Sequence, residues 1–315
     1  MGQVHSLVRG MIRHFVRSAV GACAVGALAA STFAAAPPAR DAPARWSQLA
    51  DMPFRNLTQD AGLPGPIATA LATDADGFLW VGTQAGLARW DGYRFRVYRP
   101  VPGDIHALPD SWVQALRTDS KGRLWIGTNT GGLARYDRDH DRFIVTPAGP
   151  NGLSHVYVRG LEEDGAGGLW IATEGGLDHL NPDTGEIKHL RHIDGDAGSL
   201  PVNRIVTVLR DHQGALWVGT PNGLVRRKAE GQPFEPIILP TASKQPAFVR
   251  ALYQDSSKRI WVGTMGQGAF LLQDGAAPRA VVSSDPSQAT LQTDRVLTIT
   301  EAPNREIWLG TYSGG

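Results

Sequence analysis

Short apolar runs recur along the chain at a regular interval, and each run contains one tryptophan. The runs read LWVGT, LWIGT, LWIAT, LWVGT, IWVGT and IWLGT, with tryptophans at Trp80, Trp125, Trp170, Trp217, Trp261 and Trp308. Successive tryptophans are 45, 45, 47, 44 and 47 residues apart. A self-similar string at one period indicates a tandem array of similar structural units.

Each period contains four strand-like segments separated by turn residues. In the second repeat these segments are residues 113–116, 123–128, 133–136 and 142–145. Short strands at regular spacing predict an all-β fold, and four strands in about 45 residues are the size of one propeller blade. We therefore predict a β-propeller of four-stranded blades, of which about five and a half are present.

The turn before each tryptophan has a regular composition. An aspartate stands six residues before it in five repeats, at Asp74, Asp119, Asp164, Asp211 and Asp255. A glycine stands three residues before it in four repeats, at Gly77, Gly122, Gly167 and Gly214. The carboxylate can accept backbone N–H groups at a turn start, and glycine can adopt the left-handed conformation that such a hairpin needs. Because Lys258 and Arg305 replace the glycine in the last two repeats, we expect those hairpins to be less regular.

We expect the six tryptophans to be structural. The faces of a blade pack on neighbouring blades, and the glycine or alanine two residues after each tryptophan would let adjacent sheets approach closely. Burial of one indole removes about 150–250 Å² from water, which is worth about 4–6 kcal/mol as an upper bound.

The N-terminus has the pattern of an export signal. Three arginines precede an apolar stretch at 19–30, and small residues follow at 31–36. The stretch is too short to span a membrane, so we predict a cleaved signal peptide over 1–34, a linker over 35–51 and the propeller over 52–315. An uncleaved signal anchor is the alternative.

Composition limits which cross-links and which partners are expected. Cys23 is the only cysteine and lies in the predicted signal, so disulfides cannot stabilise the exported part. The signal holds three of the 31 basic residues and no acidic one, which leaves 28 basic against 30 acidic residues. This near-neutral charge gives no reason to expect a nucleic-acid partner.

The repeat consensus is S-L-P-x-x-x-V-x-x-L-x-x-D-x-x-G-x-L-W-[IV]-G-T-x-x-G-L-x-R-[WY]-D, with its best matches at residues 107–137, 86–91 and 198–201. It resembles the two-component regulator propeller family, over roughly residues 54–315. The resemblance implies a periplasmic sensor propeller, followed by an immunoglobulin-like domain, a transmembrane helix and a cytoplasmic output. That output is commonly a histidine kinase, often a hybrid kinase, or a diguanylate cyclase.

The sequence contains no phosphoacceptor-histidine helix, nucleotide-binding motif or GGDEF-like string. We therefore expect it to be the N-terminal portion of a longer receptor anchored in the inner membrane, or a truncated gene product. The resemblance favours an incomplete seven-bladed ring. Residues 54–57 match the end of a repeat, and a strand there would complete the last blade. The chain alone should then form an open arc whose exposed edge is prone to aggregation.

The loops at one end of the blades are the candidate ligand-binding site. Since the strands alternate in direction, the loop into each first strand and the loop after each tryptophan strand open on one face, and binding residues often lie on such loops. The lead-in positions, thirteen before each tryptophan, are Ile67, Trp112, Tyr157, Arg204, Phe248 and Arg295. The loops after the tryptophan strand supply Gln84, Asn129, Glu174, Asn222, Gln267 and Tyr312. These positions vary while the framework repeats.

Such a mixture of aromatic, amide, arginine and carboxylate side chains suits a small polar ligand such as a carbohydrate. Trp112, Tyr157, Arg204 and Arg295 are the strongest candidates. A rim that simply tolerates variation is the alternative. Further expected partners are the remainder of the receptor's own chain and a second receptor in a dimer.

No metal, cofactor or catalytic site is expected. His189 and His192 lack a nearby cysteine or third histidine, so their segment is interpreted as a solvated loop. The alternating aspartates at 137–141 lack the glycine and glutamate of a calcium loop, and residues 181–185 are interpreted as a turn.

Two other functions remain open. Streptogramin lyases are propellers with a related repeat, but their strand typically ends in Thr-Glu, and here only Thr173 is followed by glutamate, Glu174. The second alternative is a protein-interaction scaffold. A C-terminal extension with a membrane span would distinguish the sensor function from both alternatives.

We predict that the exported protein begins at Ala35. The basic start, the apolar stretch and the Thr-Phe-Ala sequence at 32–34 place cleavage there, because Pro37 disfavours a later cut. N-terminal sequencing of the secreted product measures this. A mature protein that still begins at Met1 or Met11 would contradict the cleaved signal.

Overall fold

The computed structural model describes residues 57–241, 245–281 and 294–312, and the predicted signal and linker lie outside this part. The described residues contain 22 strands and one 3-10 helix, η1 (Gln59–Ala61). Five sheets have four strands each and a sixth has two, all with neighbours in sequence order. Every strand pair is antiparallel. The predicted all-β fold of four-stranded blades is therefore confirmed.

The blades are numbered in chain order. Blade 1 contains β1 (Ala68–Thr73), β2 (Leu79–Thr83), β3 (Gly86–Trp90) and β4 (Phe95–Tyr98). Blade 2 contains β5 (Val113–Thr118), β6 (Leu124–Thr128), β7 (Leu133–Asp137) and β8 (Arg142–Thr146). Blade 3 contains β9 (Val158–Glu163), β10 (Leu169–Thr173), β11 (Gly176–Leu180) and β12 (Ile187–Leu190). Blade 4 contains β13 (Thr207–Arg210), β14 (Leu216–Thr220), β15 (Gly223–Arg227) and β16 (Glu235–Ile237).

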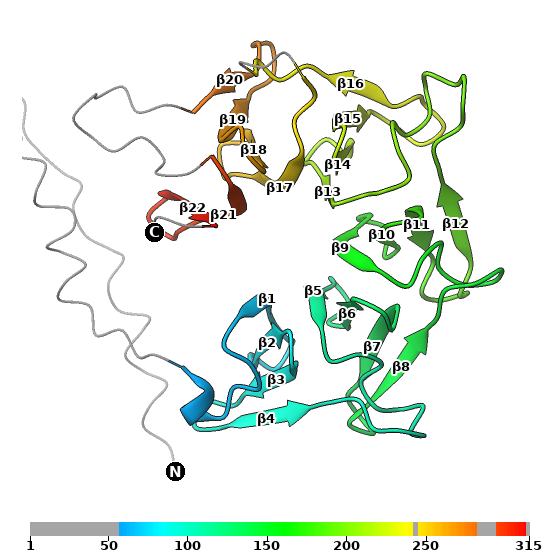
Figure 1. Ribbon diagram of the computed structural model, residues 1–315, viewed down its shortest axis with the longest axis vertical. Coiled ribbons are helices and arrows are strands. Elements are labelled where there is room, and N and C mark those ends of the chain that lie inside the picture. Colours follow the sequence, from blue (N-terminus) through cyan, green and yellow to red (C-terminus); the bar gives the residue numbers. More distant parts are fainter. Residues whose placement is uncertain (1–56, 242–244, 282–293, 313–315) are drawn as a thin grey trace, which may run out of the picture. The chain divides into compact units, whose positions relative to one another are not determined.

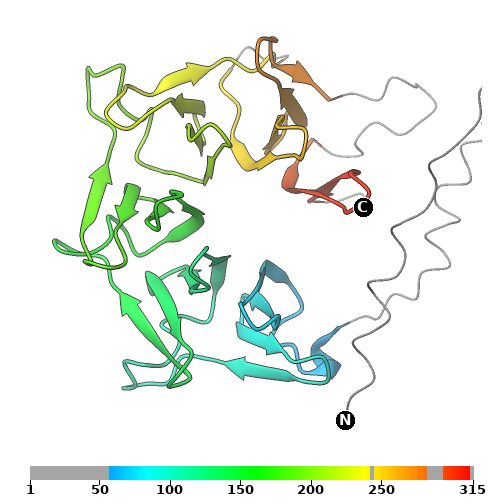
Figure 2. The same cartoon turned by 180° about the vertical axis from the view of Figure 1, so that it is seen from behind.

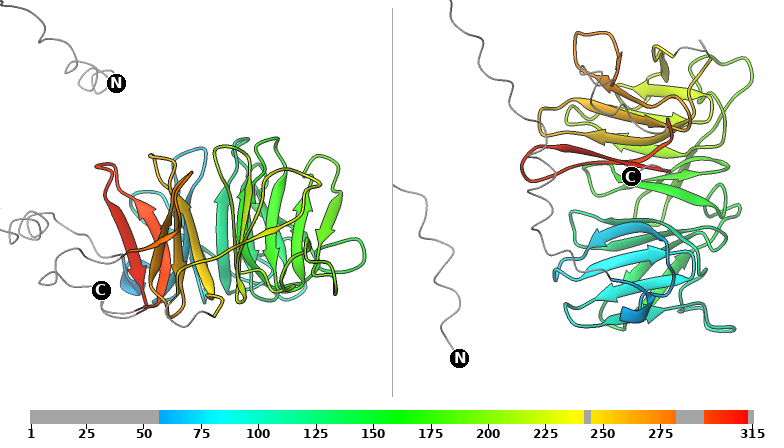
Figure 3. Two further views of the ribbon diagram at one scale, coloured as in Figure 1. Left: turned by 90° about the horizontal axis from the view of Figure 1, so that it is seen from above. Right: turned by 60° about the vertical axis from the view of Figure 1, so that its left-hand side comes forward.

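Blade 5 contains β17 (Val249–Gln254), β18 (Ile260–Thr264), β19 (Ala269–Leu272) and β20 (Arg279–Ala280), and blade 6 contains β21 (Val296–Glu301) and β22 (Ile307–Thr311). The first strand of each blade lies innermost and the fourth outermost (Figures 1 and 2). Successive inner strands contact one another, from β1 through β5, β9, β13 and β17 to β21. Seen from the side, the connecting loops gather at the two ends of the strands (Figure 3).

The proposed fourth strand at 54–57 falls almost wholly outside the described residues. Leu57, the one residue of it that the structure describes, precedes η1 and belongs to no strand. The total of seven blades stays a prediction.

A repeated contact joins each blade to the next. A Cβ atom placed on Gly82 of β2 would lie 2.6 Å from a methyl group of Val113 in blade 2. The same short distance separates Gly127 from Val158, so a side chain at either glycine would push the blades apart. Blades 4 and 5 repeat the arrangement at their own glycines. The predicted role of this glycine is therefore confirmed.

The tryptophans pack in the same interfaces. Trp80 is fully buried in a cluster with Leu124, Ile126 and Phe143 of blade 2. In contrast, Trp308 in the last described sheet is 49% exposed. The difference follows from the packing, since each buried indole faces the blade that follows its own.

The aspartate before each tryptophan organises the hairpin, as predicted, and makes one further bond. In blade 4, Oδ1 of Asp211 accepts the N–H groups of Gln213 and Ala215 at 3.0 and 2.9 Å. Its Oδ2 accepts the indole Nε1–H of Trp217 at 2.7 Å. The same indole bond forms in blades 1, 2 and 5. In blade 3, His179 approaches the equivalent carboxylate of Asp164 at 2.8 Å instead.

The expectation of less regular hairpins in blades 5 and 6 is wrong. Lys258 and Arg305 adopt φ angles of 67° and 66°, in the left-handed region that the glycines occupy elsewhere. The Lys258 N–H bonds the Asp255 carbonyl at 2.9 Å, as the Gly122 N–H bonds that of Asp119. In blade 5 the N–H groups of Arg259 and Trp261 donate to Asp255. In blade 6 Ala302 stands at the aspartate position, and the turn still forms although a Cβ atom makes this conformation unfavourable.

We predict that Asp211→Ala destabilises the protein by about 2–4 kcal/mol, because it leaves two backbone N–H groups and a buried indole N–H without their acceptor. The shift of the urea unfolding midpoint measures the loss. Asp139→Ala, at an exposed turn position, is the control and should change stability by less than about 0.5 kcal/mol. Equal effects of the two changes would refute the structural role of Asp211.

A buried carboxyl between inner strands should make stability depend on pH. Burial raises the pKa of Glu162 from 4.5 to about 7, against the opposing effect of Arg117, whose Nη2 lies 2.8 Å away. Because the folded state holds this proton more tightly than the unfolded chain, the contribution is fully present below about pH 4.5 and is lost as pH rises through 7.

We therefore predict that Glu162→Gln flattens the fall in stability between pH 5 and 8, by at most about 3 kcal/mol at about 1.4 kcal/mol per pKa unit. Urea denaturation at several pH values measures it. Glu186→Gln, at an exposed position, should leave the slope unchanged. If the slope of the Glu162→Gln variant equals that of the parent, the raised pKa is wrong.

Candidate functional site

The two predicted sets of loop residues lie at one end of the blades. The backbone N–H of Asn129 bonds the carbonyl of Trp112 at 3.0 Å, and that of Glu174 bonds the carbonyl of Tyr157 at 3.3 Å. Tyr312 bonds the Arg295 carbonyl in the same way at 3.0 Å. The lead-in residues and the residues after the tryptophan strand are therefore neighbours, as predicted, and together we call them the rim.

An irregularity in the inner strands adds side chains that the sequence analysis missed. The pairing of β5 with β6 skips Gln114, and the pairings of β9 with β10 and β17 with β18 skip Arg159 and Arg250. Such a β-bulge turns one extra side chain away from the regular alternation. A signal was present in the sequence, because this position, eleven before the tryptophan, changes between polar and apolar while the residue before it is always apolar.

The bulge side chains connect the rim of one blade to that of the next. Nε2 of Gln114 lies 3.3 Å from Oδ1 of Asn129 in its own blade and 3.3 Å from the hydroxyl of Tyr157 in blade 3. The Arg159 guanidinium lies over the Tyr157 ring, 4.4 Å from its centre. Blades 2 and 3 thus share one polar network.

A carboxylate extends this network to blade 4. Nε of Arg159 donates to Oε1 of Glu174 at 2.7 Å, and Nε of Arg204 lies 3.2 Å from the same oxygen. Arg204 also lies over the ring of Phe248 in blade 5, at 5.7 Å. One glutamate therefore holds two arginines from adjacent blades.

Arg250 lies beside this network without joining it. Burial, followed by the positive charge of Arg159, lowers the pKa of Arg250. Among the residues that the structure describes, none forms a hydrogen bond or ion pair with its guanidinium.

The structure does not gather every predicted residue into this network. Arg295 lies over the ring of Tyr312 at 5.4 Å in blade 6. Gln84 and Asn222 are exposed on the loops of blades 1 and 4. The remaining members of the rim are the exposed lead-in residues of blades 1 and 2, Ile67 and Trp112, and a half-buried loop residue of blade 5, Gln267. Trp112 therefore lies at the predicted end of the blades but outside the network.

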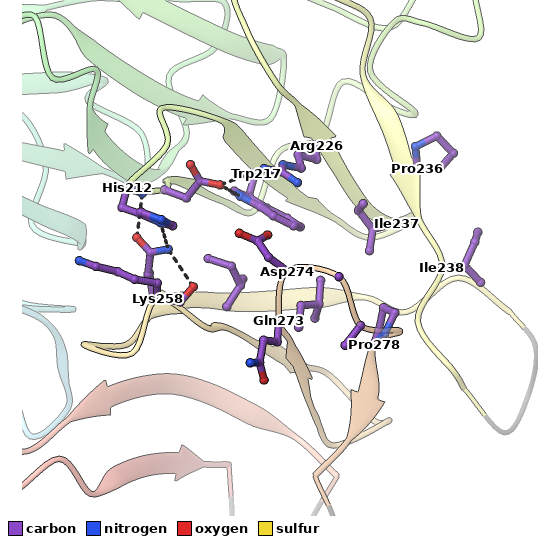
Figure 4. A pocket seen from close by; sticks show the side chains of 16 residues that line it. His212, Trp217, Arg226, Pro236, Ile237, Ile238, Lys258, Gln273, Asp274 and Pro278 are labelled. Atoms are coloured by element: carbon purple, nitrogen blue, oxygen red, sulfur yellow. Dashed lines mark hydrogen bonds and ion pairs between the residues drawn. The ribbon is translucent and has the colours of Figure 1, made fainter.

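Three cavities lie away from the network. One of about 370 Å³ opens between blades 4 and 5 at the end opposite the rim, where Figure 4 shows His212, Lys258 and Asp274 around it. Several of its polar groups have protein partners, such as Gln213 for Asp274 at 2.9 Å. A second lies beside the loops of blade 2. The third, of about 380 Å³, is mostly apolar and includes Asn222, while the other rim residues line none of the three.

A serine, a histidine and an aspartate meet in blade 3, although no such set could be assembled from the sequence. Ser154 Oγ lies 2.5 Å from Oδ1 of the fully buried Asp178, and His189 Nδ1 lies 2.7 Å from that oxygen. However, the same Nδ1 also faces Ser154 Oγ at 3.0 Å. In a nucleophilic triad the two imidazole nitrogens serve the two partners separately. This cluster therefore lacks that geometry.

The two histidines considered as a metal pair have different partners. His192 bonds the Leu200 carbonyl at 2.6 Å, whereas His189 faces Asp178. Within the described ranges no group of three potential ligands gathers. Residues 181–185 form the predicted turn, closed by a 2.8 Å bond from Gly185 to the Asn181 carbonyl. In the hairpin at 137–141 the terminal aspartates bond protein side chains.

Comparisons with solved structures find the same fold in bacterial sensor proteins. The extracellular domain of the hybrid two component system BT3049 from B. thetaiotaomicron is 20% identical with a TM-score of 0.54, over 83% of this chain and 41% of that one. That of BT4673 from the same organism is 22% identical with a TM-score of 0.56, over 78% and 37%. The chain thus spans about two fifths of these domains.

The fold is shared more widely. Virginiamycin B lyase from Staphylococcus aureus is 16% identical with a TM-score of 0.59, over 78% of this chain and 77% of that one. No curated protein matches the sequence. Over the described residues, no helix has the length and apolar character needed to cross a membrane.

A family sequence profile, two component regulator propeller, matches the chain five times. The matched residues are 62–85, 107–130, 152–175, 199–222 and 243–266. Each match covers a lead-in loop, an inner strand and a tryptophan strand, which are the parts that form the blade interface and the rim. The chain belongs to the two component regulator propeller family.

Proposed function

We propose that this chain is the ligand-sensing propeller of a bacterial transmembrane signalling receptor, located in the periplasm after export. The receptor's output is a histidine kinase or a diguanylate cyclase in the cytoplasm. The rim binds a small polar ligand, such as a carbohydrate. The rest of the receptor chain, and a second receptor in a dimer, carry the signal onward.

One observation carries this proposal. Side chains from adjacent blades converge on the rim. Hydrogen bonds, one cation–π contact and one ion pair connect Gln114, Tyr157, Arg159, Glu174 and Arg204 in sequence. A site built from several blades responds to a ligand that bridges them, and the rigid framework behind it holds the side chains in place. The extracellular domains of the two-component systems named above support a sensor role by likeness of fold.

We propose binding rather than catalysis for this part of the protein. The single Thr-Glu step ends in Glu174, whose carboxylate is occupied by two arginines. The serine, histidine and aspartate of blade 3 share one imidazole nitrogen. An interaction scaffold remains the alternative function, and a lyase the less favoured one.

We predict that alanine substitutions of Trp112, Tyr157, Arg204 and Arg295 abolish the response of the complete receptor to its ligand. The melting temperature should fall by no more than a few degrees, because none of these four side chains belongs to the buried apolar clusters between the blades. Output activity and thermal melting of each variant measure the two effects.

Alanine substitutions at Asp139 and Ser257, exposed on hairpins of the opposite face, are the matched controls and should leave the response intact. A response that survives all four rim changes but is removed by changes on the opposite face would overturn the choice of rim.

A further inference from the structure

The rim carries an excess of positive charge where blades 3, 4 and 5 meet. Arg159, Arg204 and Arg250 come from three successive blades, and Glu174 supplies the one carboxylate that bonds any of them among the described residues. The first two share this carboxylate at 2.7 and 3.2 Å. Arg250 has neither a hydrogen bond nor an ion pair within the described part of the chain.

Such an arrangement is unfavourable in the free protein. Burial and the neighbouring Arg159 both oppose the charge of Arg250, as its lowered pKa indicates. Like charges held together in a partly desolvated place are a common feature of functional sites, because a ligand of opposite charge relieves the repulsion. Among the described side chains of this cluster, Tyr157 favours the charge of Arg250, but no carboxylate bonds its guanidinium.

The geometry of the arginines suits a planar or tetrahedral oxyanion. The Arg159 and Arg204 guanidiniums lie over the rings of Tyr157 and Phe248, which fixes their orientation before a ligand arrives. A guanidinium presents its N–H groups as a fork that can bond two oxygens of one carboxylate or sulfate. Bonding to Glu174 uses one edge of these groups and leaves further N–H donors.

We propose that Arg159, Arg204 and Arg250 receive an anionic group of the ligand, so that the sensed molecule is an acidic one. The inference rests on the proposed function of the rim as a binding face and specifies the chemical class of the ligand. The oxyanion lies against Arg250, and the apolar parts of the ligand contact the aromatic rings beside it.

Binding of two simple anions to the purified full chain tests this. D-glucuronate is compared with D-glucose, which has a hydroxymethyl group in place of the carboxylate, and sodium sulfate is compared with sodium chloride at equal ionic strength. Isothermal titration calorimetry should detect glucuronate and sulfate with at least tenfold higher affinity than glucose and chloride. Glucuronate affinity should also fall as sodium chloride is added.

Arg250→Gln should weaken both anions at least tenfold without lowering the melting temperature, since it removes a charge that has no partner. Arg279→Gln, which removes one exposed charge from the outer strand β20, is the control and should change affinity less than twofold. Arg204→Gln provides a second variant if Arg250→Gln does not fold.

The proposal is overturned if glucuronate and sulfate bind no better than glucose and chloride, or if Arg250→Gln binds them as the parent does. The responses of variants of the complete receptor then distinguish a failure of the acidic-ligand proposal from a failure of the rim as the binding face. A response lost in the Trp112→Ala and Tyr157→Ala variants but kept in Arg250→Gln would leave the rim as the sensing face and remove the acidic ligand. A response kept in all three variants would contradict both the rim as the sensing face and the acidic ligand.

Discussion

The architecture depends on the close approach of each blade to the next. At Gly82, Gly127, Gly219 and Gly263 the valine that opens the following inner strand would lie within 2.8 Å of an added Cβ atom. The absence of a side chain brings the sheets close enough for the neighbouring tryptophan to fill the rest of the interface. This contact recurs in blades 1, 2, 4 and 5, while Ala172 stands at the glycine position in blade 3. The angle between adjacent blades is therefore determined by local packing at each interface.

The same contact explains the location of the candidate site residues. The valine sits at the start of the inner strand, directly after the lead-in residue and directly before the bulge residue. In blade 3, these are Tyr157, Val158 and Arg159. The buried valine anchors the backbone, so the side chains on either side of it are held at the rim whatever their identity. A rigid position that tolerates many residue types is a suitable place for a binding site to diversify.

The periodic framework could be predicted from the sequence, because the tryptophan, glycine and aspartate spacing determines strand order and turn position at once. The strand bounds in blade 2 agree with the prediction to within two residues. The error at Lys258 and Arg305 came from treating glycine as necessary for the left-handed turn position, which both of these residues adopt. The rim's position was also predictable, because alternating strands leave only two faces for the loops.

The positions of the Gln114, Arg159 and Arg250 side chains at the rim could not be derived from the regular alternation of side chains along a strand. A regular strand would put the residue after the valine on the opposite face from the valine, whereas a bulge changes this direction locally. Nor does the sequence reveal that Arg159 and Arg204 meet at Glu174 while Arg250 stays apart, since those three blades are related only through the curvature of the array. The bulge occurs in blades 1, 2, 3, 5 and 6, but carries Thr69 in the first and Leu297 in the last. The bulge thus recurs in most of the described blades, whereas the charge at blades 3 to 5 comes from particular residues and is the basis of the proposed acidic ligand.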